Sequence, residues 1–542
     1  MRSFYSTPLF LALLALAVWV GIAVLLLAPG HLAISGIEGD VLHALDGAAR
    51  IAEGARQHVD FATPLGLIAF GLPAELLAAG FGPGRALILS NIIVAALILP
   101  ALIWLRITRL SPLLAALLAL WALFETTVLV HDDVTATVTM ALYYNRWCWA
   151  VFILMAVVLL IPVRDGQRAA LGDGLILGLG AAFLVLVKLT FMVALILPLL
   201  VWILSGKRWR VLAGALASGT LALAAATLWS GDLLVWPAYL ADLLQVATSD
   251  TRPQPGMTLP EVMAAPQFIM GSFALVASIM VLRMAGLKAQ GLMLLTLMPG
   301  MIYVTYQNWA NAPVWLVVLT LLLLDARPRL PETRRAAGMP ARTALGALTI
   351  VAVTQVAPYV ANVVASPFRH LAVDTEEYSD QMPVPGWDDL LFLAQRNAIA
   401  IGQVPMAPPP PDLSLQAKWD LTAVSFQGRE FAACAFTSGL STQMQGRAES
   451  LSALPDLAQA NVMTVDLLNV TWMFAGGRPL PGGSPWYYGG TKGFETADWF
   501  VVPTCPQSTL VRALILEELG RAEWQLVERF ADDIVVVYER VR

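Results

Sequence analysis

The residues of this chain that could do chemistry begin in a charged loop behind the first apolar segment. The loop runs from Glu38 to Gly66 and reads EGDVLHALDGAARIAEGARQHVDFATPLG. Asp40 opens it, an amphipathic helical pattern follows and ends at Gly54, and Asp60 comes six residues later. Acidic residues held at a membrane surface suggest chemistry on a group that the lipid delivers.

Asp40 is the first candidate for a catalytic residue. A carboxylate can take the proton of an acceptor in a group transfer, and a nearby cation would neutralise a phosphate leaving group. The structural alternative is a helix cap, because Asp is a favoured N-cap and the helix is predicted to start at Val41. Glu38 and Asp46 are predicted to be surface charges.

Asp60 and His58 are candidates for binding the substrate. They stand in the sequence His58-Val59-Asp60-Phe61, where Asp60 could orient the loop or hold a cation together with Asp40. The alternative is a turn-forming Asp before Thr63-Pro64.

A second polar segment follows a later apolar run. Asp132 and Asp133 come directly after His131 and are candidate metal ligands together with Asp40, because adjacent acids beside a His can bind a divalent cation. The alternative is a helix end followed by polar turn residues. Tyr144 and Asn145 close this loop and are candidates for binding the substrate.

Two basic residues are candidates for binding a lipid phosphate. Arg146 could clamp a phosphate with two parallel hydrogen bonds, or it could be a snorkelling Arg in an aromatic belt. Lys188 interrupts the apolar block 171–205, which at ~1.5 Å per residue is too long for one ~30 Å crossing. We therefore predict two helices with Lys188 near the turn between them. An ammonium inside a membrane is costly without a partner, and a lipid phosphate is one such partner.

A compact polar turn between two late apolar runs is a candidate sugar-binding segment. It holds Gln307, Asn308 and Asn311 with Tyr306 and Trp309, so amide hydrogen bonds and aromatic stacking are available; the alternative is a simple chain turn. The long loop 230–266 carries several acids but identifies no ligand.

Composition places the chain in a membrane. Of its 542 residues, 58% are hydrophobic and 13% are charged, about half the charged share of a soluble domain. Apolar runs near spanning length recur from Leu9 to Val364, which predicts a polytopic α-helical protein with about 11–13 transmembrane helices. The net charge of −5 argues against binding to nucleic acid.

The distribution of Lys and Arg predicts the topology. Basic residues flank one set of short loops, which we assign to the cytoplasmic side. The outer loops are then 30–64, 131–146, 230–266 and 307–311, with everything after 365. Residues 65–81 are predicted to form a re-entrant or tilted juxtamembrane helix. The predicted spans are 8–28, 86–105, 110–130, 147–163, 172–187, 189–204, 211–229, 267–283, 290–306, 312–325 and 343–364.

The last third has ordinary polarity, which predicts a transmembrane domain over 1–365 and an extracytoplasmic α/β domain over 366–542. Cys434 and Cys505 lie in this second domain, either as a disulfide or as two separate buried thiols. Strands are predicted at 421–426, 462–470, 499–502 and 534–538, and helices at 387–397 and 509–520.

The first loop resembles the corresponding loop of the GT-C superfamily of glycosyltransferases, which includes protein O-mannosyltransferases and lipid A aminoarabinose transferases. Their pattern is an acid, a helix, a Gly, an Asp-Phe-like stretch and a Pro before the next helix. Asp40, Gly54, Asp60-Phe61 and Pro64-Leu65 match it at similar spacing. Val41 departs from the family, because many relatives have a second acid there.

The resemblance implies inverting transfer of a sugar from a polyprenyl-phosphate donor to an acceptor on the outer face of the inner membrane, with the C-terminal domain in the periplasm. Asp40 maps onto the catalytic acid of the family, and Asp132 or Asp133 onto an acid of the second outer loop. Lys188 and Arg146 match no family motif. Some relatives use a divalent cation such as Mg or Mn and others do not.

The acceptor is left open by the sequence and could be a glycan, a lipid or a protein. Two other functions remain as alternatives. A secondary transporter should show paired halves with interrupted helices, and no internal repeat is evident. A non-catalytic assembly protein for cell-envelope glycans would leave Asp40 without a role.

Overall fold

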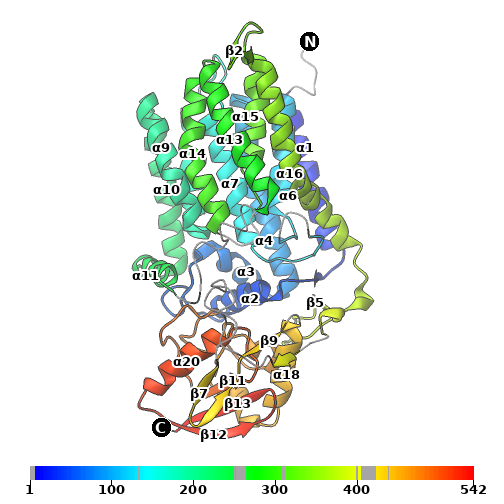
Figure 1. Ribbon diagram of the computed structural model, residues 1–542, viewed down its shortest axis with the longest axis vertical. Coiled ribbons are helices and arrows are strands. Elements are labelled where there is room, and N and C mark those ends of the chain that lie inside the picture. The colour runs from blue at the N-terminus through cyan, green and yellow to red at the C-terminus, as the bar shows by residue number, and fades with distance from the viewer. Residues whose placement is uncertain are drawn as a thin grey trace.

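A helical bundle with a smaller mixed domain at one end makes up the molecule (Figure 1). The computed structural model describes residues 7–131, 135–249, 251, 264–307, 312–397, 401–403, 423–436 and 439–541.

The bundle confirms the prediction of a polytopic helical membrane protein. Among the described residues, eight helical segments are long and apolar enough to cross a membrane. They are α1 (Pro8–Leu27), the joined pair α4 (Pro83–Leu97) and α5 (Leu99–Thr108), α7 (Tyr143–Leu160), α8 (Ala170–Val187), α9 (Leu189–Gly206), α10 (Trp209–Ser230), α13 (Pro266–Met284) and α16 (Ala341–Leu371). Packed among them are α6 (Pro112–Thr126), α14 (Lys288–Gln307) and α15 (Leu316–Arg329), so every predicted span overlaps a helix.

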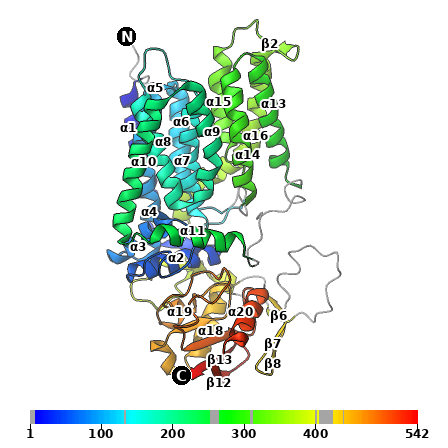
Figure 2. The same ribbon diagram turned by 90° about the vertical axis from the view of Figure 1, so that its left-hand side faces the viewer.

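Residues 65–81 form a helix at the end of the bundle, as predicted. Helix α3 (Leu67–Ala78) lies against α2 (Glu38–Ala52), beside the C-terminal domain (Figure 2). Its chain reverses at Gly80, whose φ of +91° suits a residue without a side chain. Pro83 then occupies the first turn of α4, where its missing N–H costs nothing. Because α3 stays at this end of the bundle, it does not change the direction in which the later helices run.

Lys188 separates α8 from α9. Its backbone is extended, with φ −156° and ψ 104°, so the long apolar block is two helices as predicted. The amphipathic helix α11 (Val235–Ala247) lies at the same end of the bundle as α2 and α3 (Figure 2). At the opposite end, strands β2 (Arg335–Ala336) and β3 (Met339–Pro340) form a small hairpin (Figure 1).

The C-terminal domain is built on a four-stranded sheet of order β10-β11-β13-β12. Strand β10 (Val462–Thr464) runs parallel to β11 (Trp499–Pro503), and β13 (Val535–Val541) is antiparallel to β11 and to β12 (Gln525–Ala531). Helix α20 (Thr509–Arg521) packs its apolar side on this sheet. The domain also contains α18 (Leu440–Leu451), α19 (Thr471–Ala475), β6 (Ile401–Gln403), β7 (Val424–Phe426), β8 (Arg429–Phe431) and β9 (Cys434–Phe436).

The structure tests three local predictions in this domain. A disulfide joins Cys434 and Cys505, which decides between the two alternatives left by the sequence. The strand predicted over 462–470 ends at Thr464. The chain turns after this residue, and the side chain of Asn469 accepts a hydrogen bond from the Thr464 N–H. The prediction of a helix over 387–397 is wrong, because its central apolar residues form the strand β5 (Leu390–Leu393).

Strand β5 ties the C-terminal domain to the first loop. It pairs in parallel with β1 (Leu32–Ile34), with Leu32 opposite Leu390, and its other edge pairs with β4 (Tyr378–Ser379). The predicted domain limit at 366 falls inside α16, which continues to Leu371. Two segments more than 350 residues apart thus share one sheet below the bundle.

Candidate active site

Helix α2 presents the acidic residues of the first loop. It begins at Glu38, and its N-cap is Ile37 in the left-handed conformation (φ 57°). Asp40 is half-buried and stands within the first helical turn, so it is not the N-cap. A negative charge in the first turn is stabilised by the helix dipole.

Glu38 and Asp46 are not surface charges, which corrects the prediction. The Glu38 carboxylate is buried and forms an ion pair with Arg396. The Asp46 side chain is fully buried and accepts from Arg50 Nε (2.7 Å) and from Trp472 Nε1 (2.6 Å). The C-terminal domain therefore covers this helix, a contact that the local sequence does not reveal.

The end of the first loop docks on the break between α8 and α9. The Gly66 N–H donates to the Val187 carbonyl oxygen (2.9 Å), and Gln57 holds the Leu65 carbonyl oxygen (2.7 Å). A Cβ on Gly66 would lie 2.4 Å from the Leu186 carbonyl carbon, closer than real Cβ atoms come to backbone. Glycine is thus needed for the loop to reach the residue before Lys188.

We expect Gly66→Ala to destabilise this junction by about 1–3 kcal/mol, because a methyl group would have to displace backbone on both sides. Thermal unfolding of the purified protein measures the change. Gly21→Ala is the matched control, since nothing lies within 4 Å of a Cβ at Gly21. Equal stability of the two variants would contradict the close approach.

His58 and Asp60 fix the shape of the first loop. His58 is buried with φ 70°, donates from Nδ1 to Asp242 Oδ2 (2.9 Å) and stacks on Tyr239. Burial lowers the pKa of His58, and the hydrogen bond with Asp242 partly opposes this. Asp60 pairs with Arg56 (2.8 Å), whose hydrogen bond holds the pKa of Asp60 below its usual range. Both contacts position the loop.

Asp242 links three parts of the chain. Besides His58, it accepts from the Thr63 N–H (3.0 Å) and from Lys492 Nζ (3.1 Å), so helix α11, the first loop and the C-terminal domain meet at one carboxylate. Gln245 of the same helix donates to the Gly489 carbonyl oxygen (2.7 Å). The loop around Gly489 is thereby held against the bundle.

A cavity of about 630 Å³ lies at this meeting point. Its walls come from α2, the end of the first loop, the starts of α7 and α9, helix α11, the end of α14 and the C-terminal loop. The lining residues are His43, Pro64, Leu65, Tyr144, Lys188, Leu189, Thr190, Leu243, Val246, Ala247, Tyr303, Tyr306, Gln307 and Tyr488. Three of the predicted site residues, Tyr144, Lys188 and Gln307, are brought together here.

Lys188 supplies positive charge to the cavity. It is 6% exposed and donates from Nζ to Asn145 Oδ1 (3.0 Å). The ammonium also lies 5.5 Å from the ring centroid of Tyr144. These two contacts orient the ammonium in the wall of the cavity.

His43, Tyr303 and Tyr488 line the cavity but were not among the residues singled out from the sequence. The His43 ring packs edge-on between Phe70 (5.3 Å) and Trp486 (5.5 Å) and lines the cavity from α2. It follows Asp40 by three residues, the spacing that puts two side chains on one helix face. Asp40 itself is not a lining residue and lies one helical turn from that wall.

Arg146 lies apart from the cavity, although it neighbours Asn145 in sequence. Its guanidinium is buried, donates to the Tyr359 hydroxyl (3.2 Å) and to the His131 carbonyl oxygen, and stacks over the Tyr359 ring. Tyr359 in turn donates to Glu125. This cluster fastens α7 to α16 and α6, and Arg146 does not line the cavity around Lys188.

Four predicted site residues lie outside the described residues: Asp132, Asp133, Asn308 and Asn311. Among the residues that are described, no three of His, Cys, Asp or Glu gather in a way that could hold a metal ion. The proposed metal site of Asp40 with Asp132 and Asp133 therefore stays a prediction.

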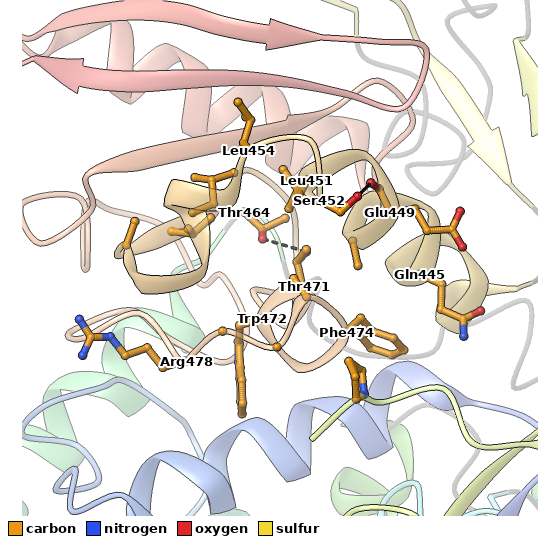
Figure 3. A pocket seen from close by; sticks show the side chains of 18 of the residues that line it. Gln445, Glu449, Leu451, Ser452, Leu454, Thr464, Thr471, Trp472, Phe474 and Arg478 are labelled. Atoms are coloured by element: carbon orange, nitrogen blue, oxygen red, sulfur yellow. Dashed lines mark hydrogen bonds between the residues drawn. The ribbon is translucent and has the colours of Figure 1, made fainter. Parts of the chain in front are cut away.

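A different cavity of about 540 Å³ lies within the C-terminal domain (Figure 3). Aliphatic side chains such as Leu451 and Leu454 line it, and the Thr464 hydroxyl donates to Thr471 (2.9 Å) inside it. Trp472 points from it toward α2, where it meets Asp46. This cavity shares no lining residue with the one around Lys188.

No family model and no curated protein matches this chain. Two crystal structures of ArnT from Cupriavidus metallidurans align with it, each at 12% identity over 98% of this chain and 97% of theirs. The apo structure gives a TM-score of 0.45, and the structure bound to undecaprenyl phosphate gives 0.44.

Proposed function

We propose that this protein is a membrane glycosyltransferase of the GT-C type, which moves a sugar from a polyprenyl-phosphate donor to an acceptor on the side of its C-terminal domain. The observation that carries the proposal is the cavity of about 630 Å³ in which Lys188 of the membrane bundle faces aromatic side chains and the first loop.

The cavity suits a lipid phosphate with a sugar attached. Tyr303 on α14 both lines it and is half exposed, so a lipid chain would enter from this side in the proposed reaction. The Lys188 ammonium is a strong partner for a phosphate in such a poorly solvated place. Tyr306 and Tyr488 offer rings for stacking on a sugar, and Gln307 offers an amide for its hydroxyl groups.

Asp40 is proposed as the general base. In this mechanism the acceptor gives its proton to the Asp40 carboxylate, and its nucleophilic atom forms a bond to the anomeric carbon. The bond from that carbon to the phosphate oxygen breaks, and the polyprenyl phosphate leaves with the electron pair. Attack opposite the leaving group inverts the anomeric configuration.

Each remaining candidate has a supporting part in this mechanism. Lys188 stabilises the charge that grows on the leaving phosphate, and Asn145 and Tyr144 orient it. His58 and Asp60 hold the first loop in shape. Asp132 and Asp133 are the residues that would hold a divalent cation, which would help to neutralise the phosphate.

We propose that the reaction takes place on the extracytoplasmic face. The first loop and the C-terminal domain, which both line the cavity, lie at one end of the bundle, away from the β2–β3 hairpin that holds Arg335 (Figure 1). Positively charged loops favour the cytoplasm. The disulfide between Cys434 and Cys505 supports an oxidising compartment such as the periplasm for the C-terminal domain. The acceptor of the proposed transfer is a glycan, a lipid or a protein.

We expect Lys188→Met to weaken binding of polyprenyl phosphate about ten- to a hundredfold, because one charge-assisted hydrogen bond is lost. Quenching of intrinsic tryptophan fluorescence by added decaprenyl phosphate gives the affinity. Lys207→Met is the matched control, since Lys207 is exposed at the far end of α9. If both variants bind the lipid as the wild type does, Lys188 is not the phosphate ligand.

A further inference from the structure

A second cavity opens in the membrane bundle at the end away from the C-terminal domain. It has a volume of about 580 Å³ and is enclosed by the end of α7, the starts of α8, α10 and α14, and the end of α9. The polar side chains in its wall are Arg109, Gln167, Asp173, Ser205, Arg208 and Gln290. None of these residues has a role in the proposed transfer.

A buried ion pair forms one wall of this cavity. Arg109 is bound to both carboxylate oxygens of Asp173, at 2.8 Å and 2.5 Å, and its Nε donates to the Ile161 carbonyl oxygen (3.0 Å). Trp104 Nε1 also donates to Asp173 (3.2 Å). The two charges compensate one another, so this pair gives the wall its shape and no net charge.

Arg208 adds a charge that this pair does not compensate. Its guanidinium stacks over the ring of Trp202 (4.1 Å to the centroid) and donates to the Trp202 carbonyl oxygen. In the part of the chain that the structure describes, no ion pair includes Arg208. The chain turns at Lys207 with φ 48°, which brings the Arg208 side chain back over α9. A half-buried, oriented guanidinium therefore faces the cavity.

The two cavities of the bundle are separate sites. Both are built on α7, α9 and α14, but Val158 of this cavity follows Tyr144 of the other by about four turns, or roughly 20 Å along α7. Between them, the buried rings of Trp149, Phe152 and Phe191 pack edge to face at 5.2–6.4 Å. The two cavities share no lining residue.

We propose that this second cavity binds a phosphate group at the predicted cytoplasmic face, with Arg208 as its cation and Ser205, Gln167 and Gln290 as further hydrogen-bonding residues. Guanidinium groups fit phosphate oxygens with two parallel hydrogen bonds. Basic pockets between transmembrane helices at this depth suit the headgroups of anionic lipids. The phosphate belongs either to such a headgroup or to a soluble phosphate compound.

The test measures thermal unfolding of the full-length protein in detergent. Three probes are titrated separately: dioctanoyl phosphatidylglycerol, dioctanoyl phosphatidylcholine and inorganic phosphate. Each is added to the wild type, to Arg208→Gln and to Arg210→Gln. Arg210 lies two residues further on, in the first turn of α10, but is exposed and does not line the cavity, so it controls for general attraction to this basic segment.

We expect phosphatidylglycerol to raise the Tm of the wild type and of Arg210→Gln. Arg208→Gln should need an about ten- to a hundredfold higher concentration of the lipid for the same rise in Tm. Stabilisation by inorganic phosphate that also depends on Arg208 would support the site and assign it to a soluble phosphate. Equal effects of phosphatidylcholine and phosphatidylglycerol, or unchanged binding in Arg208→Gln, would overturn the proposal.

A measurement on the wild type alone decides the case if Arg208→Gln does not fold. Added salt screens the attraction between a guanidinium and an anion. We expect the stabilisation by phosphatidylglycerol to weaken as the NaCl concentration rises. Stabilisation that is indifferent to salt would rule out Arg208 as the binding cation.

Discussion

Asp40→Asn should lower sugar transfer by about 10²- to 10⁴-fold, because the amide cannot take the proton of the acceptor. The variant should keep its fold, since the side chain is half-buried and changes little in size. Binding of decaprenyl phosphate should also persist, because Lys188 and the cavity walls are untouched.

The measurement is the release of polyprenyl phosphate from a panel of decaprenyl-phosphate sugars in reconstituted membranes. Glu53→Gln is the matched control: Glu53 is an exposed acid at the other end of α2, and its variant should turn over as the wild type does. Full turnover by Asp40→Asn would remove Asp40 from the mechanism.

Asp46→Ala is expected to destabilise the protein by about 3–5 kcal/mol, which is the cost of leaving a buried charge without its partner. Arg50 would lose its carboxylate, and Trp472 Nε1 would lose its acceptor. Because Asp46 and Arg50 lie on α2 and Trp472 lies in the C-terminal domain, the loss should also loosen the contact between them. Thermal unfolding and limited proteolysis of the C-terminal domain measure the two effects.

Glu517→Ala is the control for Asp46→Ala. Glu517 and Arg521 form an ion pair at the same spacing of four residues, but both side chains are about 60% exposed. Surface pairs contribute little, so this variant should lose less than about 1 kcal/mol. A small effect at both positions would mean that the buried pair does not hold the two parts together.

The sequence predicted the membrane bundle well because a helix that crosses a membrane is determined by a local run of apolar residues. The break at Lys188 was visible for the same reason, since the apolar block exceeds one crossing. Residues 65–81 contain the short helix α3 at the end of the bundle, which agrees with the prediction; the argument against another crossing was that it would reverse the charge distribution of every later loop.

Contacts between distant segments could not be predicted. The sequence of strand β5 is also compatible with a helix, and its pairing with β1 cannot be seen in the local sequence. Asp46 was predicted to be a surface charge because its contact with Trp472 comes from a distant part of the chain. Arg146 and Lys188 were equivalent candidates in the sequence. In the structure Arg146 donates to Tyr359 on a helix distant in sequence, whereas Lys188 lines the cavity. His43 was missed although its spacing from Asp40 was a usable signal.

The location of the donor phosphate is the central claim, and a cryo-electron microscopy structure of the protein in nanodiscs with decaprenyl phosphate tests it most directly. We expect phosphate density within hydrogen-bond reach of Lys188 Nζ, with the lipid chain leaving past Tyr303 on α14. Density for the phosphate at another place on the bundle, with the Lys188 cavity free of lipid, would contradict the proposed donor site.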